Sequence, residues 1–189
     1  MPLPPRPHLL GIDDGPFDKR TSRSVPVVGV MMEGPDLVEA LAVTSFPVDG
    51  EGVADFLVAW VAGLRFRPAL QGIVLGGLTI AGLAVVDVER LASGLDLPVL
   101  VVNRREPTDH KLLAALESAG LGARREILAR APRSHPVGDR LFVAACGLDP
   151  GEAAAAVRAS RNKSEVPEPL RLAHLVATAL ARGESRGRP

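Results

Sequence analysis

Residues 8–46 of the chain read HLLGIDDGPFDKRTSRSVPVVGVMMEGPDLVEALAVTSF. Three apolar segments rich in β-branched residues, at 8–14, 25–34 and 36–46, precede any helical pattern in the sequence. The EGPD turn signal joins the second segment to the third. Three strands with short connections predict an antiparallel meander at the start of the fold.

After the meander, helical spacing alternates with short apolar runs. Helices are predicted at 51–66, 81–95, 108–120, 149–160 and 168–182, and strands at 72–77, 97–104 and 141–147. A meander followed by βαβ units predicts an α/β fold, a mixed sheet with helices on both faces, in the element order of ribonuclease-H-like domains. The 189 residues contain no internal repeat and no long linker, so we expect a single domain. Its ends would be an extended, proline-rich lead-in at 1–8 and a flexible tail at 183–189.

Composition excludes several classes of protein. Lys plus Arg equals Asp plus Glu at 22 each, so the total charge gives no strong footprint for nucleic acid. Cys146 is the single cysteine, which leaves no intrachain disulfide and no cysteine-based zinc cage. The apolar stretches are shorter than a membrane span, and the N-terminus lacks the apolar core of a signal peptide. We expect a soluble, cytoplasmic protein with no membrane contact.

Two pairs of carboxylates lie where strands end. Asp13 and Asp14 end the first strand and point to opposite faces, so at most one of them is expected to face a given site. That carboxylate could bind Mg²⁺, and an Asx-type turn explains the pair equally well. Asp49 and Glu51 lie between the third strand and the first helix, where an N-cap and a helix-dipole partner are the favoured interpretation. The alternative is that Asp49 converges with Asp13 in space.

The other polar residues have ordinary explanations beside functional ones. The glycines of VLGGLTIAG (74–82) match no phosphate-loop pattern and indicate close packing of backbone. Asp87 is predicted to be a solvated residue within a helix. Arg104 and Arg105 follow a buried strand and could form a phosphate fork, or could simply be solvated. Three histidines without ligand-like spacing are expected to be surface residues, namely His8, His110 and His135.

The last predicted helix carries unusual polar residues in VPEPLRLAHLVATALARGESRGRP (166–189). Prolines are well suited to its first turn, because the N–H that they lack has no helical partner there. One side of the helix would be polar, and the opposite side, with Leu172, Leu175, Val176 and Ala179, would face the core. The polar side consists of Glu168, Arg171, His174 and Thr178. By itself His174 fits either a catalytic role or a hydrogen bond to a neighbouring loop, and the second is favoured.

Taken together, GIDDGPF, VVGVMMEG, FPVDGEG, GIVLGGLTIAGLAVVDVERL, LPVLVVNRREP and the C-terminal VPEPLRLAHLVATALARGESRGR resemble domain-of-unknown-function family 99 over essentially the whole chain. That family is similar in fold to endonuclease V, a ribonuclease-H-like, metal-dependent nuclease that cuts beside deaminated purines. PEPLRLAH here resembles the PEPTRLAH run of endonuclease V. The tail sequence GESRGR belongs to the same resemblance, which implies a docking role for it.

The resemblance implies a site. Asp13 matches the metal-binding aspartate of the first strand, Asp49 lies loosely where the nuclease has a glutamate, and His174 matches its C-terminal histidine. These three would be the catalytic residues, with Mg²⁺ or Mn²⁺ on Asp13 and Asp49. Arg104 falls where the nuclease has a lysine, so it would contact phosphate together with Arg171. The implied partner is DNA or RNA.

One departure from endonuclease V divides the functional hypotheses. Gly76 stands where the nuclease has a further metal-binding aspartate, and the loss of one carboxylate weakens metal binding and the positioning of water. The first hypothesis is Mg²⁺-dependent phosphodiester hydrolysis, reduced or absent because of Gly76. The alternative is a non-catalytic module that binds nucleic acid or a nucleotide on the same fold, and a small-molecule enzyme is a third reading.

Overall fold

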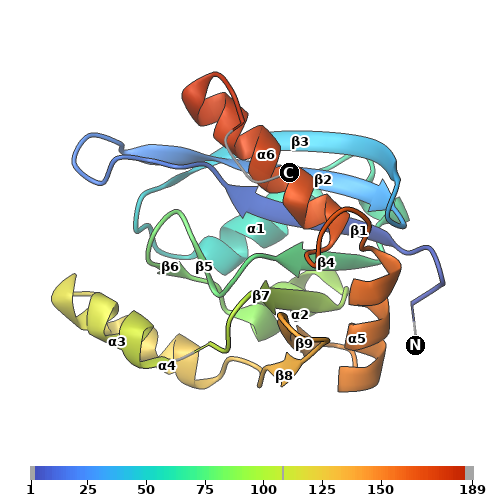
Figure 1. The fold of residues 1–189 in the computed structure, drawn as a ribbon. Helices are drawn as coiled ribbons and strands as arrows, with labels where there is room; N and C mark the ends of the chain where they lie inside the picture. Colours follow the sequence, from blue (N-terminus) through green and yellow to red (C-terminus); the bar gives the residue numbers. More distant parts are fainter. Residues whose placement is uncertain (1–2, 108, 186–189) are drawn as a thin grey trace.

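The computed structural model describes residues 3–107 and 109–185. It opens with three strands, β1 (His8–Asp14), β2 (Ser24–Glu33) and β3 (Leu37–Pro47). β2 pairs antiparallel with both β1 and β3, so the predicted meander is confirmed (Figure 1).

The meander continues into a mixed seven-stranded sheet of order β3-β2-β1-β4-β7-β9-β8. β4 (Gly72–Leu75) is parallel to β1, and β7 (Val99–Asn103) is parallel to β4. β9 (Phe142–Cys146) is antiparallel to β7, and β8 (His135–Pro136) is antiparallel to β9. The predicted βαβ arrangement therefore holds for β1, β4 and β7 and ends there. Because parallel strands end at the same edge of a sheet, residues following β1, β4 and β7 meet at one edge.

Helices cover both faces of the sheet, as predicted (Figure 1). Leu10 and Ile12 belong to the core under α1 (Val53–Ala62) and α2 (Val88–Leu95). The opposite face carries two further helices, α5 (Pro150–Ala159) and α6 (Glu168–Arg182). The other short elements are the strands β5 (Thr79–Ile80) and β6 (Ala84–Val85), the 3₁₀ turns Arg67–Ala69 and Gly122–Arg124, and the helices α3 (Asp109–Ser118) and α4 (Arg125–Ala129). Over the part of the chain that the structure describes, no helix is long and apolar enough to cross a membrane.

The segment predicted as one helix at 81–95 is wrong in its first half. Residues 79–85 form a two-stranded hairpin, in which Ala81 and Gly82 have positive φ angles of 53° and 92°. α2 begins only at Val88, and Asp87 is its N-cap rather than a mid-helix residue, accepting a hydrogen bond from the backbone N–H of Arg90 at 3.0 Å. The helix predicted at 108–120 corresponds to α3, and Thr108, the first residue of the predicted helix, lies outside the described residues.

α6 packs on β1 and β2 through a different face from the one predicted. Ala173 and Ala177 are fully buried against Val28 and Val30 of β2, and the supposedly polar Thr178 is buried as well. Gly11 of β1 allows this close approach, because a Cβ there would lie 2.2 Å from the carbonyl carbon of Pro169. Small residues on both elements thus bring the helix backbone close to the sheet, which moves the polar edge of the helix toward the end of β1.

Candidate functional site

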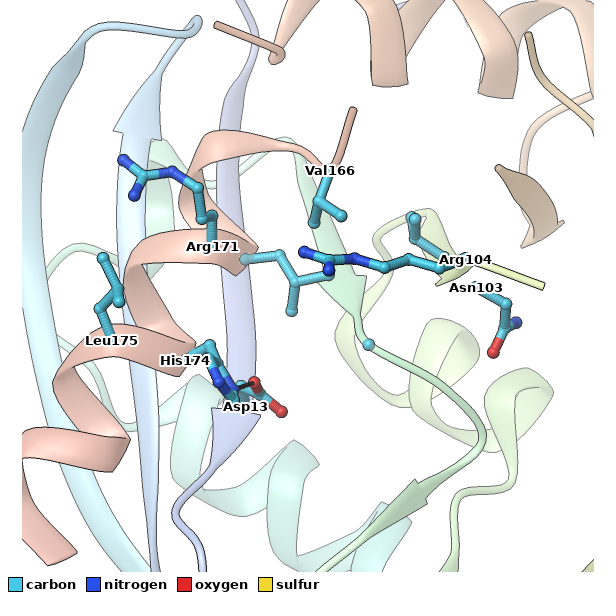
Figure 2. A pocket seen from close by; sticks show the side chains of 10 residues that line it. Asp13, Asn103, Arg104, Val166, Arg171, His174 and Leu175 are labelled. Carbon is cyan, nitrogen blue, oxygen red and sulfur yellow. Dashed lines mark hydrogen bonds and ion pairs between the residues drawn. The ribbon is translucent and has the colours of Figure 1, made fainter. Parts of the chain in front are cut away.

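An Asp–His pair lies at the carboxyl end of β1. Nδ1 of His174, on the second turn of α6, donates a hydrogen bond of 2.8 Å to Oδ2 of Asp13 (Figure 2). The hydrogen bond raises the pKa of His174, because the carboxylate stabilises the imidazolium. The imidazole side chain is half exposed at 53%, and Nε2 makes no hydrogen bond within the described residues. The pair therefore presents a ring nitrogen, held in one orientation, to the outside of the sheet edge.

The neighbouring Asp14 is the last residue of β1. Burial, followed by the negative charge of Asp13, raises the pKa of Asp14 to about 6, although the backbone N–H of Ala81 stabilises its ionised form. A hollow next to the pair is lined by both aspartates, His174 and Thr178. The hydroxyl of Thr178 is buried and has no hydrogen-bond partner among the residues described. This side of the site therefore contains a buried oxygen that a water molecule can satisfy.

A cavity of about 430 Å³ opens on the other side of the Asp–His pair, between α6 and the ends of β4 and β7. Its lining includes Asp13, Gly76, Asn103, Arg104 and His174. The Arg104 side chain extends from the end of β7 across the cavity toward α6, and its charge opposes the protonation of His174 (Figure 2). Asn103 is a cavity residue that the sequence analysis does not predict. Its position at the end of β7, next to Arg104, is the sequence signal that points to it.

Gly76 lies directly beside the predicted metal-binding aspartate. A Cβ built on Gly76 would be 3.7 Å from Oδ1 of Asp13 and 3.6 Å from Leu170. Both distances are ordinary van der Waals contacts, so a side chain fits at this position. Residue 76, where the resemblance to endonuclease V implies an aspartate, is therefore next to Asp13, and a glycine there contributes no carboxylate.

Arg171 reaches the same cavity and is already paired. Its Nε and Nη2 donate to the carboxylate of Glu168 at 2.9 Å and 2.6 Å. Glu168 is buried with 3% of its surface exposed, and its other oxygen accepts from the backbone N–H of Lys163 at 3.0 Å. This buried pair fixes the loop before α6, and it occupies most of the guanidinium fork that was predicted to bind phosphate.

Asp49 lies in the turn between β3 and α1 and is fixed by local contacts. Its backbone is left-handed with φ 53°, and its Oδ1 accepts a hydrogen bond of 2.7 Å from the N–H of Leu83. Arg124 donates to the carbonyl oxygens of both Asp49 and Leu83, each at 2.6 Å. The N-cap of α1 is Gly52, so the predicted capping role of Asp49 is wrong. Asp49 joins the β3–α1 turn to the β5–β6 hairpin and does not line the cavity at Asp13.

A group of side chains that could hold a metal ion occurs at the opposite end of β1. One ligand atom each from His8, Glu33 and Glu39 lies within 4.8 Å of the others. His8 was expected to be a surface residue without ligand-like partners, and this expectation is wrong. The cross-strand register could have revealed the group, because His8 of β1 lies directly opposite Glu33 of β2.

A mixed sheet in this strand order, covered by helices on both faces, is the architecture of a ribonuclease-H-like α/β protein. The family model described as Endonuclease dU matches residues 5–181, and the chain belongs to that family.

Relatives of known sequence or structure agree with this assignment. UPF0215 proteins of Methanothermobacter thermautotrophicus and Archaeoglobus fulgidus are each 38% identical to the chain, over 95% and 96% of it and over 90% and 97% of their own lengths. A crystal structure of a protein of unknown function from Archaeoglobus fulgidus superimposes with a TM-score of 0.85 at 35% identity, covering 93% of this chain and 98% of that one. Endonuclease V from Streptomyces avermitilis superimposes with a TM-score of 0.63 at 18% identity, covering 96% and 84%. The predicted likeness in fold to endonuclease V is confirmed, while the name family 99 remains a prediction.

Proposed function

We propose that the protein is an endonuclease that cleaves a DNA strand at a deaminated nucleotide, with deoxyuridine as the substrate nucleotide. The matching family, Endonuclease dU, supports deoxyuridine as the substrate nucleotide. A structural neighbour supports DNA as the substrate: endonuclease V of Ciona intestinalis, solved in complex with DNA containing an inosine. It superimposes with a TM-score of 0.56 at 13% identity, covering 89% of this chain and 83% of that one. The observation that carries the proposal is the hydrogen-bonded Asp13–His174 pair facing a cavity that Arg104 also lines.

Each residue has a role in this proposal. Asp13 orients the ring of His174 and keeps it protonated at Nδ1, so that Nε2 faces the substrate as a proton donor or a phosphate contact. Arg104 binds a phosphate oxygen next to the cleaved bond, because its guanidinium lines the cavity and has no ion-pair partner among the described residues. The predicted phosphate contact of Arg171 is weaker, since Glu168 holds its fork.

The donor set suits a divalent cation of the Mg²⁺ or Mn²⁺ type only if the cation is held by few protein ligands. Mg²⁺ takes one or two carboxylates and keeps several waters or phosphate oxygens. Oδ1 of Asp13 is free of the histidine, and Asp14 together with the unpartnered hydroxyl of Thr178 lines the adjacent hollow. When bound, such a cation would polarise the phosphate and supply an activated water. Asp49 is not included in this set, because it does not line the cavity at Asp13 or the adjacent hollow.

Nicking of defined duplexes tests the proposal. A labelled duplex with one deoxyuridine is incubated with Mg²⁺ or Mn²⁺ beside duplexes carrying thymidine or inosine at the same position. We expect strand cleavage only at deoxyuridine, and losses of at least about 100-fold in Asp13→Asn and His174→Gln, a typical effect of removing acid–base groups. His135→Gln, at an exposed position in β8, is the matched control and should keep full activity. Cleavage that persists unchanged in Asp13→Asn would refute the site.

A non-catalytic nucleic-acid-binding module is the second candidate, and Gly76 favours it. With a glycine beside Asp13, the site lacks the carboxylate that would complete a stronger cation-binding set. In that case the wild-type protein would shift the deoxyuridine duplex in a gel without cleaving it, and Arg104→Gln would weaken the shift. Neither cleavage nor binding would exclude both candidates and leave a small-molecule substrate.

A further inference from the structure

Three strands of the meander bring potential metal ligands together far from Asp13. His8 opens β1, Glu33 closes β2, and Glu39 is the third residue of β3. The start of β1 and the β2–β3 turn lie at the same end of the sheet (Figure 1). A strand rises about 3.3 Å per residue, so His8 is roughly 16 Å from Asp13 along β1. The cluster is therefore a separate site.

The orientation of the His8 ring is fixed from outside the cluster. Nδ1 of His8 lies 3.3 Å from the carbonyl oxygen of Ala69, and a carbonyl can only accept, so Nδ1 carries the proton. The backbone N–H of His8 is also held, by the side-chain oxygen of Gln71 at 2.9 Å. Nε2 is consequently the atom that faces the two glutamates. A histidine that donates one ring N–H to a backbone carbonyl and directs the other nitrogen at carboxylates has the arrangement of a metal ligand.

The distances suit a shared cation better than direct hydrogen bonds. Nε2 of His8 is 3.8 Å from Oε2 of Glu33 and 3.6 Å from Oε2 of Glu39. Both separations exceed the usual N–H···O range of about 2.7–3.2 Å. Ligands bound to Zn²⁺ at about 2.1 Å in tetrahedral geometry lie roughly 3.4 Å apart, so small side-chain movements would close the triangle on a metal ion.

The surrounding charges support binding of a divalent cation. Arg6 donates to Oε1 of Glu33 at 3.1 Å and pairs with Asp36 at 2.5 Å, so Oε1 of Glu33 is occupied and its Oε2 is left facing His8. With a neutral imidazole, the three carboxylates and one guanidinium of this group leave two negative charges. A divalent ion would neutralise this excess. The side chains of His8, Glu33 and Glu39 are each about 30% exposed, which leaves room for a water molecule as a fourth ligand.

We propose that His8, Glu33 and Glu39 form a binding site for a zinc-type divalent cation, which ties the three strands of the meander together at the end opposite to Asp13. One imidazole and two carboxylates, with an open fourth position, match zinc and its neighbours in the first transition series. Mg²⁺ prefers oxygen ligands only, so it would compete poorly here and would bind preferentially at Asp13. The site does not depend on the proposed nuclease function.

Metal titration of the full chain tests the site. The protein is stripped with a chelator and titrated with Zn²⁺ by calorimetry, and with Co²⁺ by visible absorption, in the Asp13→Asn background so that the nuclease site does not contribute. We expect one equivalent of Zn²⁺ and a tetrahedral-type Co²⁺ spectrum. His8→Gln and Glu39→Gln should each weaken Zn²⁺ binding by at least about tenfold, a conservative figure because changes outside the ligand shell already cost 10–100-fold. His135→Gln, another strand histidine, should bind like the parent protein.

Two results would overturn the site. The first is no Zn²⁺ binding in the Asp13→Asn background, which would leave the cluster as an ion-pair network with an imidazolium at His8. The second is Zn²⁺ binding that His8→Gln and Glu39→Gln leave unchanged. Unaltered melting of the metal-free Glu39→Gln protein shows that a loss of binding is not a loss of folding. Zn²⁺ should raise the melting temperature of the parent protein and not that of Glu39→Gln.

Discussion

Replacing Asp14 by asparagine should stabilise the protein, and only above the pH at which Asp14 ionises. The pKa of Asp14 is raised from 3.8 to about 6, first by burial and then by the charge of Asp13. Because the folded pKa lies above the unfolded one, the unfolded chain releases this proton first, and stability falls as the pH rises from about 4 to about 6. The rise of this pKa from 3.8 to about 6 makes the ionised carboxylate cost the folded state roughly 3 kcal/mol at pH 8.

The expected gain from Asp14→Asn is somewhat smaller than this penalty. The backbone N–H of Ala81 stabilises the ionised form, and asparagine replaces that acceptor with a weaker one. Partial exposure also reduces the cost of ionisation, so we expect a gain of about 1–3 kcal/mol at pH 8 and none at pH 4. For a chain of this length, 1 kcal/mol corresponds to about 2–4 °C in Tm.

Thermal melts with a chelator present, at pH values from 4 to 8, measure this gain. The control is Asp139→Asn at an exposed carboxylate, which should change stability by less than about 0.5 kcal/mol at every pH. His174 contributes separately. Its pKa is raised above 6.5, so its stabilisation is complete below pH 6.5 and is lost as the pH rises through the folded pKa. A gain in Asp14→Asn that is equal at pH 4 and pH 8, or absent at pH 8, would refute the reasoning.

Two further substitutions test the packing and the charge of the same site. Gly11→Ala places a Cβ 2.2 Å from the carbonyl carbon of Pro169, so α6 must move, and chemical denaturation should show a loss of at least about 1–3 kcal/mol; wild-type stability would contradict the close approach. Gly76→Asp adds a carboxylate beside Asp13 without a clash, and calorimetry should show at least tenfold tighter Mn²⁺ binding than in the neutral control Gly76→Asn. Equal Mn²⁺ affinity in the two variants would show that residue 76 does not face the cation.

Elements with local signals could be predicted from the sequence. The helix predicted at 149–160 is α5, and its start has a local cause: Asp149 and Glu152 form a capping box, and Pro150 lies in the first turn. The three strands of the meander were predicted within a few residues, because their apolar, β-branched runs end at a turn. In both cases the determining contacts lie within a few residues along the chain.

Features that depend on distant contacts could not be predicted. The hairpin at 79–85 has the apolar composition of a helix start, yet Asp49, more than thirty residues earlier, holds the N–H of Leu83 and fixes the turn. The prediction of which face of α6 is buried is wrong for a similar reason. Glu168 has a charged side chain, so its sequence position predicts exposure. It is buried because Arg171 and the backbone N–H of Lys163 donate hydrogen bonds to its carboxylate.

The central pair of the candidate site was predicted better than the residues around it. Asp13 and His174 are 161 residues apart in sequence and hydrogen-bonded in the structure, but only the resemblance to endonuclease V connected them. Asp49 aligns only loosely with the glutamate of the nuclease, and the hydrogen bond that its Oδ1 accepts from the N–H of Leu83 cannot be read from the sequence. Asn103 and the ligand group at His8 emerge from strand neighbours and cross-strand register, which require the sheet order to be known.

The charges around Asp13 distinguish this site from one built to concentrate metal ions. Asp13 and Asp14 contribute negative charge, while the imidazolium favoured at His174 and the guanidinium of Arg104 contribute positive charge close by. A third carboxylate at residue 76 would leave an excess of negative charge that repels a phosphodiester until a cation binds. With Gly76 the charges nearly balance, so a DNA backbone can approach without that cation. If the proposed function holds, binding of nucleic acid at this site should therefore depend less on divalent cations than cleavage does, and a chelator should abolish cleavage while binding persists.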